Sequence, residues 1–129
     1  MTPFHSTAIA LTAMALAVPA LADLPVHVYS SPDPDSTNTF AVETGAGLVV
    51  ISTQRTFSQA ERAIARIERT GRDFVAIVVP VPHTDHFGGL GVFRAAFPEA
   101  TVYAAEETIE SMRTDSGGYI ASRGEALGA

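Results

Sequence analysis

The run "FVAIVV", residues 74–79, constrains the fold of this chain more than any other feature of its sequence. An uninterrupted apolar run of β-forming residues is typical of a strand that is covered on both faces, and such a strand lies inside a sheet. Apolar residues recur at helical spacing on either side of the run: Ala60, Ala63, Ile64 and Ile67 before it, and Leu90, Phe93 and Phe97 after it. Strands that alternate with helices in this way predict crossover connections, so we expect a layered α/β fold with residues 74–79 as a central strand.

The other expected elements follow from turn and capping signals. "VHVY" (residues 26–29) predicts a short strand, and "TFAVE" and "LVVIS", separated by Thr44-Gly45-Ala46-Gly47, predict a hairpin. Ser58 and Glu61 have the spacing of a capping box for a helix that ends at Gly71. "TVYA" (101–104) predicts another strand and "EETIESM" (106–112) a short helix, whereas no sustained apolar period or closing strand follows Arg113.

Composition limits the kinds of chemistry that the chain can perform. With 129 residues and a net charge of −6, it is expected to hold at most one globular domain. All eight basic residues are arginines and they are scattered, so we expect no nucleic-acid partner. Because cysteine is absent, disulfides, thiolate metal sites and thiol nucleophiles are excluded, and histidine and carboxylate side chains must carry any reaction.

The first 22 residues have the pattern of a secretory signal peptide. An apolar stretch over residues 8–18 is followed by Pro19 and by the small-x-small sequence Ala20-Leu21-Ala22. We therefore expect cleavage before Asp23, a mature domain over residues 23–129 with no membrane span, and a periplasmic or secreted location. A buried core helix is the alternative, but residues 1–22 contain no charged side chain.

Two histidines and an aspartate lie close together in "VVPVPHTDHFGG", directly after the apolar run. A loop that leaves the carboxyl end of a strand in an α/β sheet is a usual place for ligand-binding side chains. His83 and Asp85 alternate on an extended backbone and His86 begins the next turn, so all three can face one divalent metal ion such as zinc. The alternative is that Thr84 or Asp85 caps the next helix while the histidines are exposed loop residues.

The segment "PVPHTDHFGG", together with "NTFAVETGAGLVVIS" upstream, resembles the metallo-β-lactamase superfamily over about residues 38–112. The resemblance implies an αββα sandwich, of which this chain would form the first half. It also implies a hydrolase with one or two divalent metals, zinc above all, whose bridging hydroxide attacks a lactam, lactone or thioester. Carried over by position, His83 would bind the first metal, and Asp85 and His86 the second. Asp85 would also act as the catalytic residue that orients the hydroxide.

Several positions depart from the family pattern. Val81 stands where the family has its first histidine, Pro80 where threonine is common, and Ser52 where an aspartate often ends the hairpin. No histidine follows His86, and His27 lies in a predicted strand where a structural role is expected. Neither metal site is complete, so we expect a truncated or degenerate hydrolase that is weakly active or inactive alone, with a small-molecule substrate if active.

Two other functions remain open from the sequence. One is a non-catalytic binding module derived from the fold, and the other is one half of a split hydrolase that a complementing chain completes. Self-association is expected if the apolar faces of a half-domain stay uncovered. The sequence leaves the substrate and the identity of the metal open.

Overall fold

A computed structural model of the chain describes residues 23–33 and 36–122. The predicted signal peptide, residues 1–22, lies outside the described residues. The strands are β1 (Val26–Ser30), β2 (Asn38–Glu43), β3 (Leu48–Ile51), β4 (Phe74–Val79) and β5 (Thr101–Ala104). The helices are α1 (Phe57–Ile67), the 3-10 turn η1 (Glu68–Thr70), α2 (Thr84–Phe87), α3 (Leu90–Ala96) and α4 (Glu106–Thr114). No helix in the part of the chain so described is long and apolar enough to cross a membrane.

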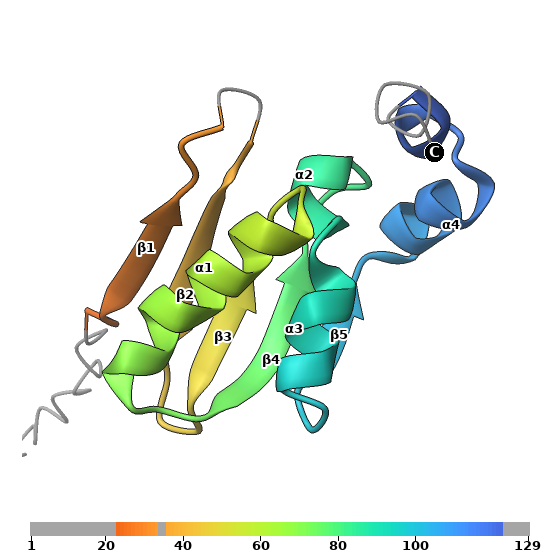
Figure 1. Cartoon of the computed structure of the whole chain (residues 1–129). Helices are drawn as coiled ribbons and strands as arrows, with labels where there is room; N and C mark the ends of the chain where they lie inside the picture. Colours follow the sequence, from red (N-terminus) through yellow and green to blue (C-terminus); the bar gives the residue numbers. More distant parts are fainter. Residues whose placement is uncertain (1–22, 34–35, 123–129) are drawn as a thin grey trace, which may run out of the picture.

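The strands form one sheet in the order β1-β2-β3-β4-β5. The first three strands are antiparallel neighbours, whereas β3, β4 and β5 run parallel. The connection from β3 to β4 contains α1, and the connection from β4 to β5 contains α2 and α3, which are the crossovers expected from the sequence. Figure 1 shows α1 and α3 side by side on one face of the sheet, with α4 beyond the end of β5.

The core lies between that face of the sheet and the helices α1 and α3. Ala60, Ala63 and Ile67 of α1 and Phe93 of α3 are fully buried, as the helical spacing predicted. They pack against inward-facing strand residues, which include Leu48, Val50 and Ile77. Helix-on-sheet packing of apolar stripes therefore accounts for the stability of this layer.

The start of α1 differs from the expected capping box of Ser58 and Glu61. The helix begins at Phe57, and Thr56 is its N-cap, because Thr56 has an extended backbone and its side chain accepts a hydrogen bond from the Gln59 N–H at 3.4 Å. Ser58 already lies inside the first turn, where it cannot act as a cap. The end of the helical segment is as predicted, since Gly71 takes a left-handed conformation at φ 69°.

The expectation that β4 is covered on both faces is wrong for the described residues. The helices cover one face of the sheet, and we call the opposite side the open face. It consists of two rows that follow the strand register across the sheet: Val28, Phe40, Ile51, Val78 and Tyr103 in one, and Val26, Val42, Val49, Ala76 and Thr101 in the other. The apolar run of β4 thus has the composition of a doubly covered strand, but no other described element packs on its second face.

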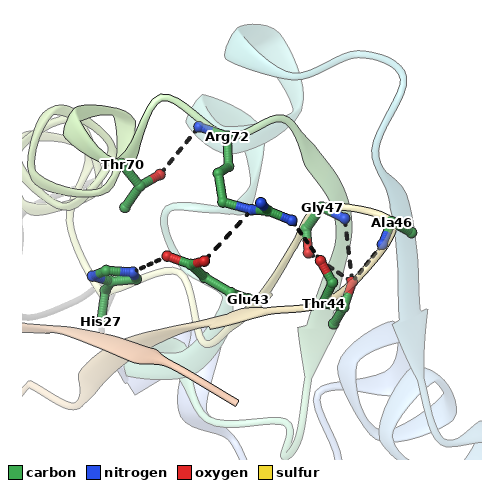
Figure 2. A network of polar contacts seen from close by, with 7 residues as sticks. All are labelled: His27, Glu43, Thr44, Ala46, Gly47, Thr70 and Arg72. Atoms are coloured by element: carbon green, nitrogen blue, oxygen red, sulfur yellow. Dashed lines mark hydrogen bonds and ion pairs between the residues drawn. The ribbon is translucent and has the colours of Figure 1, made fainter. Parts of the chain in front are cut away.

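A polar network holds the edge strand β1 to the rest of the sheet (Figure 2). Nε2 of His27 lies 2.6 Å from Oε1 of Glu43, and Arg72 approaches the second oxygen of the same carboxylate at 3.7 Å. Nη2 of Arg72 also donates to the Thr44 carbonyl at 2.6 Å. His27 therefore has the structural role expected of it. Its partner Glu43 pairs with Leu48 at the amino end of β3, whereas α2 follows the carboxyl end of the parallel strand β4, so this network lies at the end of the sheet opposite α2.

Candidate metal site at the end of β4

The candidate site forms where the parallel strands β3 and β4 end side by side. Residues 52–56 follow β3 and residues 80–89 follow β4, so the two loops meet at the carboxyl edge of the sheet. Backbone hydrogen bonds join them: the Thr53 N–H donates to the His86 carbonyl, and the Gly89 N–H donates to the Gln54 carbonyl, both at 2.9 Å. The loop that carries His83, Asp85 and His86 is therefore fixed to the end of β3.

The loop after β3 holds an unusual backbone. Ser52 and Gln54 have positive φ values of 66° and 70°, and both side chains are buried. The amide of Gln54 donates to the Thr37 carbonyl and to the hydroxyl of Thr39, so its burial leaves no donor unsatisfied. Left-handed conformations at non-glycine residues persist only where the surroundings enforce them, and they cluster at functional sites.

The paired glycines of the motif permit the close approach of the two loops. A Cβ at Gly88 would lie 2.1 Å from the Arg55 carbonyl oxygen, and one at Gly89 would lie 2.2 Å from the Thr53 carbonyl oxygen. No side chain fits at such distances. The absence of side chains at these two positions lets the turn between α2 and α3 lie directly against the backbone that follows β3.

His86 and Asp85 form the best-defined pair of the site. Nδ1 of His86 lies 2.7 Å from the hydroxyl of Ser52, and Nε2 lies 3.6 Å from Oδ2 of Asp85. Burial lowers the pKa of His86 below 6.5, an effect that Asp85 opposes and the nearby His83 reinforces. The neutral imidazole is thus favoured, and that is the form in which histidine binds a metal.

His83 lies at the rim of the site and not between the other two side chains. It is the N-cap residue of α2, is exposed, and makes no side-chain capping hydrogen bond. Its ring centroid is 6.3 Å from that of His86 and 4.4 Å from that of Tyr119. Thr84 and Asp85 lie inside α2, so the alternative in which one of them caps the helix is wrong. The expectation that His83 and Asp85 alternate on an extended backbone is also wrong, because only His83 is extended and Asp85 is helical.

A cavity of about 410 Å³ opens beside this motif, bordered by His83, Thr84 and Asp85. The sequence interpretation missed its other lining residues, Arg55, Tyr119 and Ser122. Arg55 follows β3 at the carboxyl edge of the sheet, and this position was a usable signal. Tyr119 and Ser122 come from the segment after Arg113, where no sequence period indicated a contact with the site.

The donor set does not match the two-metal centre that the resemblance implies. Among residues 23–33 and 36–122, no group of three or more His, Cys, Asp or Glu side chains converges as a metal site would require. Asp85 and His86 are of suitable chemistry and adjacent, but a catalytic zinc normally takes three protein ligands. Val81, in the bend two residues before His83, offers no donor atom.

Solved structures with the same fold support the architecture. A metallo-beta-lactamase from Hirschia baltica aligns at a TM-score of 0.54 and 19% identity, and the lactamase TMB-1 at 0.55 and 20%. Both alignments cover 70% of this chain and 42% of the other chain, so this chain spans less than half the length of either lactamase. The sec-alkylsulfatase Pisa1 from Pseudomonas sp. aligns at 0.50 and 26%, over 60% of this chain and 13% of the enzyme.

None of the curated proteins compared with the chain matches it. The sequence profile described as the metallo-beta-lactamase superfamily, however, matches residues 32–126. This range contains the hairpin, α1, the buried strand β4 and the "PVPHTDHFGG" motif. The chain belongs to the metallo-beta-lactamase superfamily.

Proposed function

We propose that this hydrolase-fold chain carries a partial metal site made by Asp85 and His86, and that by itself it binds zinc weakly and hydrolyses substrate slowly or not at all. The observation that carries the proposal is the placement of the three candidate ligands. Asp85 and His86 are paired at 3.6 Å, whereas His83 packs beside Tyr119 at the rim. Two converging donors leave a divalent ion short of the three that a catalytic zinc site uses.

The chemistry available to the chain's own residues follows from this arrangement. Ser52 fixes the ring of His86 through Nδ1, which leaves Nε2 directed toward the Asp85 side of the site. Arg55 and Tyr119, which also border the cavity, provide a cation and an aromatic face where a small substrate would lie. When bound, a divalent metal would supply an activated water to this site.

Substrate class rests on the superfamily and on the cavity. Lactam, lactone and thioester carbonyls are the substrates that the resemblance implies. The likeness to a sec-alkylsulfatase adds sulfate esters, which Arg55 at the cavity wall would accommodate by charge. We propose a small-molecule ester or amide, processed outside the cytoplasm, in the periplasm or after secretion, as the signal-like sequence of residues 1–22 indicates.

Zinc titration in competition with a chelator tests the partial site, with hydrolysis assays on a lactam, a lactone, a thioester and a sulfate ester at saturating zinc. We expect weak zinc binding that Asp85→Ala and His86→Ala reduce further, with turnover near background. His27→Ala is the matched control, because His27 pairs with Glu43 at the opposite end of the sheet. Tight stoichiometric zinc in the unchanged chain, or turnover that Asp85→Ala abolishes, would overturn the proposal.

A split or assembled hydrolase is the second candidate, and the open face favours it. The chain spans 42% of the length of the lactamases it resembles, so a second polypeptide that supplies metal-binding histidines would have a sheet face on which to pack. Restored hydrolysis on mixing with such a polypeptide supports this candidate. A partner that binds the chain without restoring hydrolysis supports the non-catalytic binding module instead.

A further inference from the structure

We infer that Tyr119 is a positioning residue that holds His83 at the rim of the candidate metal site. When the contact between these two rings is removed, His83 can join Asp85 and His86 as a third metal donor. The inference rests on the proposed partial site. His83 belongs to the same short motif as His86, yet its ring packs beside Tyr119, which comes from the segment after α4.

His83 lies close to a position from which it would share a metal ion with His86. The centroids of the two imidazole rings are 6.3 Å apart. Two imidazoles bound to one tetrahedral zinc ion, with Zn–N bonds of about 2 Å, have ring centroids about 5 Å apart. A movement of about 1 Å therefore separates the observed arrangement from one in which both rings bind the same ion.

The ring of Tyr119 contacts His83 in this rim position. The two ring centroids are 4.4 Å apart and the ring planes are tilted by 51°, a favourable arrangement for an aromatic pair. Both side chains border the same cavity and Tyr119 is 40% exposed, so the contact forms at the surface, where it can open. Because His83 must move to reach a shared ion, the contact with Tyr119 opposes metal binding.

The backbone after α4 fixes the position of Tyr119 by local interactions. Asp115 is left-handed at φ 47°, and its carboxylate accepts hydrogen bonds from the N–H groups of Ile120 and Ala121 at 3.0 and 2.9 Å. A Cβ at Gly117 would lie 2.2 Å from the Tyr119 ring, so the ring has room only because residue 117 has no side chain. The ring is therefore held at the rim by its own segment and not by the metal-site residues.

Zinc titration in competition with a chelator tests the inference on the full chain. Tyr119→Ala should tighten zinc binding about two- to tenfold, which is the effect of removing one favourable ring pair. Gly117→Ala should act in the same direction, because its Cβ displaces the Tyr119 ring. Tyr119→Phe keeps the ring and should bind zinc as the parent does. Tyr103→Ala is the matched control, since Tyr103 is also exposed but lies on β5.

A double variant and a spectroscopic measurement identify the released donor. Adding His83→Ala to Tyr119→Ala should cancel the gain in zinc affinity. On zinc addition, the ring nitrogens of both His83 and His86 should shift in long-range ¹H–¹⁵N spectra of Tyr119→Ala, whereas in the parent we expect the shift at His86 alone. Far-UV circular dichroism checks that the variants are folded.

The outcomes separate this inference from the proposed partial site. If Tyr119→Ala and Gly117→Ala bind zinc no more tightly than the parent, or if the gain persists without His83, the inference is overturned while the partial site stands. If Asp85→Ala leaves zinc affinity unchanged in both the parent and Tyr119→Ala, the partial site fails, and the inference fails with it.

Discussion

Gly89→Ala should be among the most destabilising single-methyl additions in this chain. A Cβ at this position would lie 2.2 Å from the Thr53 carbonyl oxygen and 2.5 Å from the Cβ of Ala60, so a loop or a helix must move by about 1 Å. Overpacking of this kind costs about 1–3 kcal/mol. The same movement strains the Gly89-to-Gln54 and Thr53-to-His86 hydrogen bonds, each of which contributes about 1 kcal/mol. If both hydrogen bonds are lost, we therefore expect a loss of about 3–5 kcal/mol in the free energy of unfolding.

Gly91→Ala provides the control, because Gly91 lies in α3 and a Cβ there has no neighbour within 4 Å. Alanine is the better helix former, so this variant should gain about 0.5–1 kcal/mol. Urea unfolding of both variants and the parent at one protein concentration, followed by far-UV circular dichroism, measures the difference. If the free energy of unfolding of Gly89→Ala lies within about 0.5 kcal/mol of the parent value, the close contact between the two loops does not determine stability, and the reasoning fails.

Three other expectations can be checked separately. Val81→His should tighten zinc binding in a chelator competition without restoring hydrolysis, because it adds an imidazole donor to the segment between β4 and α2 but leaves the site incomplete. Unchanged affinity would mean that the side chain at position 81 does not face the metal. Since the pKa of His86 is lowered in the folded state, the stability of the metal-free chain should fall as pH drops below 6.5 and level off above it. In a plot of melting temperature against pH, His86→Asn should remove the slope below pH 6.5. An unchanged slope would show that His86 is not the group responsible for this pH dependence. Exported protein should begin at Asp23 by intact mass, whereas a mature species that retains Met1 would refute the signal peptide.

Much of the fold was predictable because its signals are local. The hairpin at Thr44–Gly47, the end of the helical segment at Gly71 and the strand at residues 74–79 each depend on a turn residue or an apolar period within a few positions. The sequence predicted Ser58 as the N-cap of α1, whereas the structure has Thr56 there. Both residues carry a hydroxyl group, and a glutamate follows Ser58 at the spacing of a capping box. Only the backbone conformation distinguishes them.

The candidate site was less predictable, since its geometry depends on contacts between distant segments. The motif identified His83, Asp85 and His86 as a group, but sequence proximity could not show that the His83 ring lies beside Tyr119. The contact between Ser52 and His86 joins residues 34 positions apart. An apolar run such as residues 74–79 predicts that both faces of a strand are buried. It does not identify the elements that bury them, so the uncovered second face of β4 could not be predicted.

The left-handed residues Ser52 and Gln54 have a consequence for the order of folding. Their backbone conformation is unfavourable in isolation, so the short segment after β3 has no local preference for its native shape. It can acquire that shape only after α1 has packed on the sheet and β4 has paired with β3. The turn after β4 then provides the His86 carbonyl and the Gly89 N–H, which form hydrogen bonds with Thr53 and Gln54. The chain therefore completes its chemically distinctive corner after the hydrophobic layer has formed, and the shape of that corner depends on the layer.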